Sequence, residues 1–240
     1  MRIVLCETYE EMSKTAAKLV KEQLAKKPDS ILGFATGSTP IGTYQELADM
    51  CQRGEADFTN VRTFNLDEYY PILRDNDQSY YYFMNKHLYS KVNLKPENIH
   101  IPNGEAPDAA VECAGYDKEI EKLGGIDLQI VGIGGNGHIA FNEPDEELDA
   151  ATHVTGLTED TIQANSRFFA SADDVPRHAL TMGMASIMKA KKIVFLANGA
   201  GKRDAMQKLL SGKITTMCPA SMLHMHPDVT VIADKEAMGE

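Results

Sequence analysis

The chain has 240 residues, 43% of them hydrophobic and 25% charged, and its 24 basic and 35 acidic side chains give a formal net charge of −11. These are globular values, and they exclude a disordered or fibrous protein. The acidic balance argues against nucleic acid and anionic membrane surfaces as partners, because both bind clustered Lys and Arg.

Other features indicate a cytoplasmic protein that does not cross a membrane. No apolar run approaches the roughly 20 residues that a membrane helix requires, and Glu7 comes too early for a secretory signal peptide. Cys6, Cys51, Cys113 and Cys218 lie far apart and form no CxxC pair. Such spacing favours reduced thiols over a disulfide framework or a zinc site.

Short β-branched runs alternate with stretches of helical periodicity along the chain. Strands are expected at Arg2–Cys6, Ser30–Ala35, Val61–Leu66, Asn98–Ile101, Ile126–Gly132, Lys192–Ala197 and Val229–Ala233. A helix should follow the Thr8-x-x-Glu11 capping box and run to about Leu24. Further helices are expected near Pro40–Arg53, Ser79–Tyr89, Ala109–Leu123, Met184–Ala190 and Lys202–Leu210. This alternation predicts an α/β fold with a doubly wound, mostly parallel sheet and helices on both faces.

The two longest irregular stretches are expected at Asp67–Ser79 and Phe141–Leu157, where they read as loops around a site. The sequence contains no internal repeat, low-complexity tract or linker-like change in composition. We therefore predict a single domain over residues 1–240.

Four groups of polar or glycine residues follow predicted strands, at the sheet edge where ligands of open parallel sheets bind. The first is Thr36-Gly37-Ser38-Thr39-Pro40. We expect Thr39 to be an N-cap and Pro40 the first helical residue. The free N–H groups of such a helix start suit a phosphate. A strand-to-helix turn also needs a glycine and a cap, so this segment alone leaves both interpretations open.

The second group is Asp67-Glu68-Tyr69-Tyr70, after the third predicted strand. A carboxylate shielded by Tyr69 and Tyr70 would have a raised pKa and could act as a general base. An exposed loop with two solvated acids is the alternative, and this motif is weak by itself.

The third group, residues 132–144, contains the pattern GxGxxG. A dinucleotide site needs a helix directly after the last glycine, and Pro144 leaves too little room for one. We instead expect a glycine-rich turn that presents His138, with Glu143 close enough to orient the imidazole. A His–Glu pair of this kind can transfer protons near neutral pH.

The fourth group is Asn198-Gly199-Ala200-Gly201-Lys202. A lysine in the first turn of a helix opposes the helix dipole, and a bound anion would reverse that cost. Arg167 is a candidate second cation for the same anion, whereas a solvent-exposed lysine is the alternative for Lys202. His224 and His226 lack a carboxylate or cysteine at ligand spacing, so no metal site is expected.

Together these segments resemble the glucosamine-6-phosphate deaminase (isomerase) family in its short bacterial form. The matching runs are Ala35–Pro40, Thr63–Tyr69, Gly134–Pro144 and Ala164–Phe169, in order along most of the chain. The runs GHIAFNEP and FNLDEY are the most specific of them. The resemblance implies conversion of glucosamine 6-phosphate and water to fructose 6-phosphate and ammonia, in amino sugar catabolism and without a cofactor.

The resemblance also implies roles for individual residues. His138 would open the sugar ring with support from Glu143 and Asn136, and Asp67 would move the C2 proton to C1. The substrate and its phosphate would be held by Thr36, Gly37, Ser38, Arg167 and Lys202. The stretch from about His153 to Met182 would correspond to the family's mobile lid.

Two departures limit what is carried over. Many members have Asp where this chain has Asn136, so support at that position would come from hydrogen bonding rather than charge. The longer hexameric members have a C-terminal segment that this sequence lacks. We therefore expect a monomer or small homo-oligomer, and activation by N-acetylglucosamine 6-phosphate is not carried over from the longer members.

Two alternatives remain open at this stage. A 6-phosphogluconolactonase has a related Gly-His site but no evident use for a base at Asp67. A catalytically silent sugar-phosphate sensor would need neither Asp67 nor the His138–Glu143 pair, and would be expected to carry a DNA-binding segment.

Overall fold

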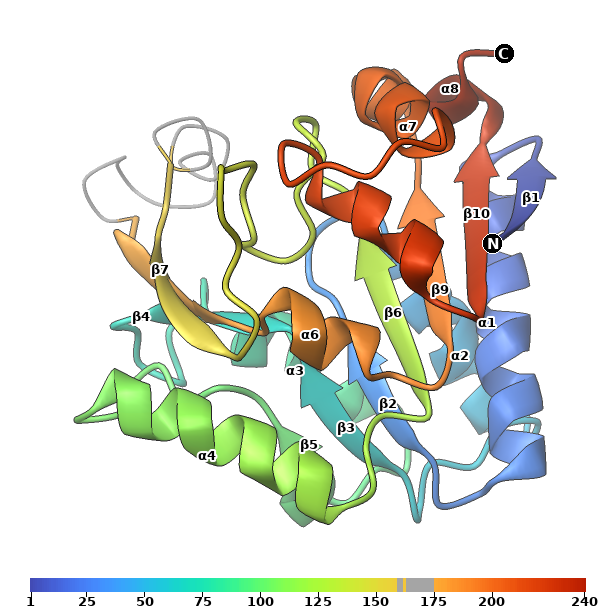
Figure 1. The fold of residues 1–240 in the computed structure, drawn as a ribbon. Helices are drawn as coiled ribbons and strands as arrows, with labels where there is room; N and C mark the ends of the chain where they lie inside the picture. Colours follow the sequence, from blue (N-terminus) through green and yellow to red (C-terminus); the bar gives the residue numbers. More distant parts are fainter. Residues whose placement is uncertain (159–161, 163–174) are drawn as a thin grey trace.

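The computed structural model describes residues 1–158, 162 and 175–240. A seven-stranded sheet forms the centre of the molecule, in the order β1-β10-β9-β6-β2-β3-β5, and every neighbouring pair is parallel (Figure 1). Its strands are β1 Arg2–Cys6, β2 Ile31–Phe34, β3 Arg62–Asn65, β5 Ile99–His100, β6 Leu128–Gly132, β9 Ile193–Ala197 and β10 Val229–Asp234. The predicted α/β class with a mostly parallel sheet is confirmed.

Helices cover both faces of this sheet. They are α1 Tyr9–Lys26, α2 Ile41–Gln52, α3 Tyr80–His87, α4 Ala109–Lys122, α6 Met184–Met188, α7 Arg203–Leu210 and α8 Lys235–Met238. In β9, Val194 and Leu196 pack into the core with α1 and α2, while Ile193 and Phe195 pack into the core with α4, α6 and α7. Burial on both sides explains why these strands are apolar at successive positions.

Of the two N-caps predicted from the sequence, the structure has one. Thr8 caps α1 as expected, since its Oγ1 accepts from the N–H of Glu11 at 3.2 Å. The cap prediction at Thr39 is wrong: α2 begins at Ile41, Pro40 is the residue before it, and no side chain caps this helix. The Thr39 hydroxyl instead donates to Asn198 Oδ1 at 2.6 Å. Thr39 thus bonds to a residue far away in the sequence and not to an N–H group of the helix beside it.

A second, three-stranded antiparallel sheet lies beside the central one, in the order β4-β8-β7. It consists of β4 Asp67–Tyr70, β7 His153–Gly156 and β8 His178–Thr181. The expectation that Asp67–Ser79 and Phe141–Leu157 are irregular throughout is therefore wrong at β4 and β7. Both strands lack an apolar run, since Asp67 and Glu68 open β4 and every second residue of β7 is exposed.

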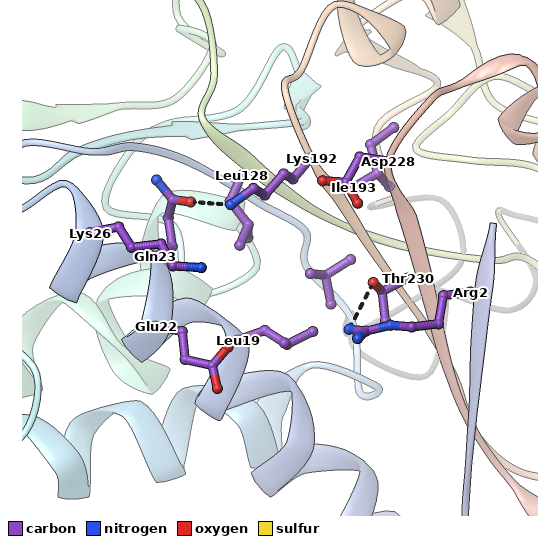
Figure 2. Close-up of a pocket in the computed structure, with 11 residues that line it drawn as sticks. Arg2, Leu19, Glu22, Gln23, Lys26, Leu128, Lys192, Ile193, Asp228 and Thr230 are labelled. Carbon is purple, nitrogen blue, oxygen red and sulfur yellow. Dashed lines mark hydrogen bonds between the residues drawn. The ribbon is translucent and has the colours of Figure 1, made fainter.

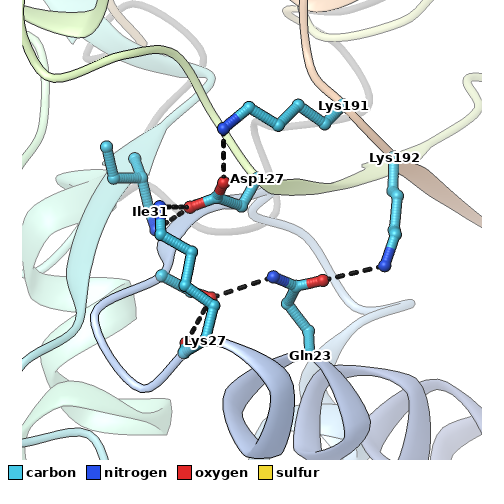
Figure 3. A network of polar contacts seen from close by, with 7 residues as sticks. Gln23, Lys27, Ile31, Asp127, Lys191 and Lys192 are labelled. Carbon is cyan, nitrogen blue, oxygen red and sulfur yellow. Dashed lines mark hydrogen bonds and ion pairs between the residues drawn. The ribbon is translucent and has the colours of Figure 1, made fainter.

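The amino-terminal edge of the sheet is held by a buried acid. Asp127 accepts from Lys27 at 2.6 Å, from Lys191 at 2.7 Å and from the N–H of Ile31 at 2.8 Å (Figure 3). Burial raises the pKa of Asp127, but the two lysines and the N–H donor outweigh it and hold that pKa below its ordinary value. This network joins the start of β2 to the segments that lead into β6 and β9, at the edge opposite the predicted site.

Candidate active site

A cavity of about 760 Å³ opens beyond the carboxyl ends of β2, β3 and β6. The chain leaves β2 and β6 toward opposite halves of the sheet, and in open parallel sheets ligands bind at such a switch point. The cavity is lined by six of the nine predicted site residues: Thr36, Gly37, Ser38, Asp67, His138 and Lys202. Segments that are far apart in the sequence thus meet at one place.

Asp67 is a buried acid on the cavity wall. It is the first residue of β4, and only 5% of it is exposed. None of the residues that the structure describes donates a hydrogen bond to its Oδ1. Burial, and then the nearby charge of Glu68, raise the pKa of Asp67 to about 8. Because Asp67 lines the cavity, its carboxylate is a candidate to take a proton from a molecule bound there.

Glu68 faces the opposite side of β4 and has a different environment. Its carboxylate accepts from the N–H groups of Tyr69, Tyr80 and Tyr81 at 2.8–2.9 Å. Burial raises the pKa of Glu68 to about 7, although these three donors oppose the shift. Glu68 therefore fastens the first turn of α3 to β4, and of the two adjacent acids only Asp67 lines the cavity.

His138, which lines the cavity, forms a hydrogen-bonded triplet with Glu143 and Asn136. Glu143 Oε2 lies 3.1 Å from Nδ1 of His138 and accepts from the Asn136 amide at 2.7 Å. The N–H of His138 donates to Asn136 Oδ1 at 3.1 Å. The contact directs the proton on the imidazole to Nδ1 and leaves Nε2 available to a ligand. Neither Glu143 nor Asn136 lines the cavity.

The glycine-rich loop makes this arrangement possible. The imidazole of His138 lies against Gly134, where a Cβ would come within 2.2 Å of the ring. Gly137 turns the chain at a φ of 102°, and no helix follows before Pro144. The rejection of a dinucleotide fingerprint is consistent with this geometry, because a helix start is needed to hold the pyrophosphate.

The loop after β2 and the turn before α7 face the same cavity. Within the described part of the chain, the N–H groups of Gly37, Ser38 and Thr39 have no acceptor. Lys202 has no ion-pair partner among those residues, and burial lowers its pKa. Free N–H donors and an unpaired, partly desolvated ammonium form a suitable environment for a phosphate. Arg167, the predicted second cation, lies outside the described residues.

Sequence reasoning missed the aromatic wall of the cavity. Tyr80 stacks on Phe141 with an interplanar angle of 5° and a centroid distance of 6.1 Å, and Tyr69 lies 4.7 Å from Tyr80. Tyr80 and Tyr82, in the helix expected near Ser79–Tyr89, also line the cavity. Tyr70 does not line it, because its hydroxyl donates to the carbonyl of Ala106.

Other hollows and clusters are weaker candidates. A cavity of about 340 Å³ at the opposite edge of the sheet mixes Arg2, Lys26 and Lys192 with Glu22 and Asp228 (Figure 2). Among the described residues, no three His, Cys, Asp or Glu side chains are grouped so that they could hold a metal ion. None of the helices described above is long and apolar enough to span a membrane.

The chain is similar to known proteins over nearly its whole length. Residues 6–232 match the model of the family described as glucosamine-6-phosphate isomerases/6-phosphogluconolactonase. The chain belongs to this family.

The relatives cover nearly the whole chain. A glucosamine-6-phosphate deaminase of Thermoanaerobacter pseudethanolicus is 58% identical over 99% of this chain and 94% of its own length. One of Halothermothrix orenii is 56% identical over 99% of this chain and 98% of its own. The solved structure of a monomeric glucosamine-6-phosphate deaminase is 45% identical, with a TM-score of 0.97, over 100% of this chain and 99% of that one.

The 6-phosphogluconolactonases share the architecture at much lower identity. The enzyme from Thermotoga maritima is 22% identical, with a TM-score of 0.77, over 97% of this chain and 98% of that one. At this identity the likeness concerns the fold alone.

Proposed function

We propose that this chain converts glucosamine 6-phosphate and water to fructose 6-phosphate and ammonia, as a step in the breakdown of amino sugars in the cytoplasm. The observation that carries the proposal is the placement of a buried carboxylate without a donor on Oδ1, Asp67, in one cavity with His138 and the unpaired Lys202. The 58% identical relative that bears the name of this activity supports the same substrate.

One end of the cavity binds the phosphate, and the other carries out the reaction. The N–H groups of Gly37 and Ser38, the hydroxyls of Thr36 and Ser38, and the ammonium of Lys202 bind the phosphate, together with Arg167. Because the phosphate is remote from the reacting carbons, its binding energy fixes the orientation of C1 and C2.

His138 opens the pyranose ring by taking the proton of the anomeric hydroxyl and donating one to the ring oxygen. Glu143 stabilises the imidazolium that forms, and Asn136 holds the Glu143 carboxylate in place through the hydrogen bond at 2.7 Å. A group that both accepts and donates a proton near neutral pH is needed here, which suits histidine.

Asp67 then takes the proton from C2 of the open chain and returns it to C1 through an enolamine. The double bond that results joins C2 to nitrogen, and water adds at C2 to release ammonia and leave the ketone. The raised pKa of Asp67, about 8, makes it a stronger base than an exposed aspartate once it is ionised. No step requires a metal or a nucleotide, so none is proposed.

The decisive experiment measures ammonia released by the purified chain from glucosamine 6-phosphate, without added metal or nucleotide. We expect turnover there and none with 6-phosphogluconolactone. Hydrolysis of the lactone without ammonia release would favour the lactonase activity, and binding without either reaction would favour a sensor. A monomer is expected in solution, as in the 45% identical neighbour.

A further inference from the structure

Two of the cavity loops are tied together by a single hydrogen bond between side chains. Thr39 Oγ1 donates to Asn198 Oδ1 at 2.6 Å, and the two residues are 159 positions apart. Thr39 lies in the loop after β2 and Asn198 in the loop after β9, and β6 separates these strands in the sheet. The bond therefore joins loops across the carboxyl end of β6, beside the glycine-rich loop that carries His138.

The Asn198 end of this bond is firmly attached to Lys202. The N–H of Gly199 donates to both carboxylate oxygens of Asp234 at 3.0 Å, and that carboxylate also caps α8 through the N–H of Ala237. The N–H of Lys202 donates to the carbonyl of Gly199 at 3.0 Å. The turn from Asn198 to Lys202 is thus held in one conformation by its hydrogen bonds to the buried Asp234 and within the turn.

The Thr39 end is attached to the row of free N–H groups. On the far side of that loop, the hydroxyl of Tyr9 donates to the carbonyl of Ser38 at 3.2 Å and accepts from the N–H of Gly42 at 2.8 Å. Tyr9 fixes the loop to α1, but it does not connect the loop to Lys202. Among the hydrogen bonds of the described residues, only the Thr39–Asn198 bond links these two loops directly.

Thr39 donates its hydroxyl proton in the hydrogen bond to Asn198. Asn198 Oδ1 can only accept, so the Thr39 hydroxyl is the donor and cannot also donate to a phosphate. We propose that Thr39 and Asn198 are positioning residues, whose hydrogen bond sets the distance between the free N–H groups of Gly37–Thr39 and the Lys202 ammonium for one phosphate. The inference rests on the proposed function insofar as it takes the ligand to be a sugar phosphate.

The test compares the KM for glucosamine 6-phosphate with kcat in side-chain variants. Thr39→Val removes the hydroxyl at nearly constant volume, and we expect it to raise KM about five- to tenfold, the usual effect of one hydrogen bond. The value of kcat should stay within about twofold, because His138 and Asp67 are untouched. Thr39→Ser, which retains the hydroxyl, should restore KM.

A double-mutant cycle separates the bond from its two partners. If Thr39 and Asn198 act through one bond, Asn198→Ala should raise KM by a similar factor, and the double variant should be no worse than either single one. Thr43→Val is the matched control, because the Thr43 hydroxyl is buried in α2 and has no hydrogen-bond partner in the described part of the chain. This control should leave KM unchanged.

The same cycle with inorganic phosphate as probe keeps the inference independent of the reaction. Calorimetry should show weaker phosphate binding to Thr39→Val and normal binding to Thr39→Ser. These results are expected even if the wild-type chain releases no ammonia. The lack of ammonia release would overturn only the proposed function. The inference itself is overturned if Thr39→Val binds phosphate as tightly as wild type or has the wild-type KM. It is also overturned if the effects of the two single variants add in the double variant, or if Thr39→Ser restores neither the phosphate affinity nor KM.

Discussion

Asp67 and Glu68 are consecutive residues of β4, and their carboxylates lie in two different cavities. Alternation along the strand directs Asp67 to the proposed reaction site and Glu68 to the start of α3, where three N–H groups bind it. Among the described residues, Oδ1 of Asp67 has no hydrogen-bond donor. The Glu68 carboxylate, in contrast, accepts three backbone hydrogen bonds. For this reason we propose Asp67, and not Glu68, as the base.

The Asp67→Asn variant should lose most turnover while keeping its affinity for sugar phosphate. Loss of a positioned general base costs about 10²- to 10⁴-fold in rate, whereas the phosphate-binding groups are unchanged. Ammonia release and the Kd for fructose 6-phosphate measure the two effects. Asp75→Asn, an exposed acid beyond β4, is the matched control. Near-normal kcat in the Asp67 variant would remove Asp67 from the mechanism.

The activity of the wild-type chain should depend on pH in a way that Glu68 controls. Asp67 must be ionised to accept a proton, so kcat/KM should rise with pH through about 8. Glu68→Gln removes the negative charge that contributes to this raised pKa, so the acidic limb should move to lower pH. Glu97→Gln, at an exposed position, is the control and should leave the profile in place. An unmoved limb in Glu68→Gln would show that burial alone sets the pKa.

The sequence predicted the central sheet well, because strands such as β9 are apolar at every position and lie between helices on both faces. It missed β4, since two adjacent acids do not resemble a strand. Without that strand, the alternation that separates Asp67 from Glu68 could not be foreseen. The contact between His138 and Glu143 was predictable, because the two residues are only five positions apart in the sequence. The contact between Thr39 and Asn198 was not, because it depends on the order of strands in the sheet.

Asn136 offers a test of how Glu143 is held. Replacing its amide by a carboxylate, Asn136→Asp, removes the donor that lies 2.7 Å from Glu143 Oε2 and places two acids in contact. Two such carboxyl groups share one proton at low pH and repel each other when both are ionised. We expect kcat/KM to be closest to the wild-type value at low pH, where the pair shares a proton, and to fall below it as the pH rises and both acids ionise. A pH profile of kcat/KM measures this, and an unchanged profile would contradict the proposed support by Asn136.

Lys202→Ala should raise the KM for glucosamine 6-phosphate more than it lowers kcat. Lys202 lines the cavity without an ion-pair partner among the described residues, and burial lowers its pKa, so it gains from a dianionic partner. The loss of one charge-assisted hydrogen bond corresponds to about 10- to 100-fold in affinity. Lys208→Ala, on an exposed face of α7, is the control. Equal losses in kcat and kcat/KM would place Lys202 at the reacting carbons instead of the phosphate.

Asp127→Asn should destabilise the fold without touching the proposed reaction site. Lys27 and Lys191 would lose their shared carboxylate, and because their side chains are 38% and 56% exposed we expect a loss of only about 1–3 kcal/mol. The folded-state pKa of Asp127 is depressed, so its stabilisation is present above the unfolded pKa near 4 and disappears as the pH falls further. Urea unfolding at pH 7 and pH 3 measures both effects. The gap between wild type and variant should shrink at pH 3, and a constant gap would mean that the carboxylate charge contributes nothing.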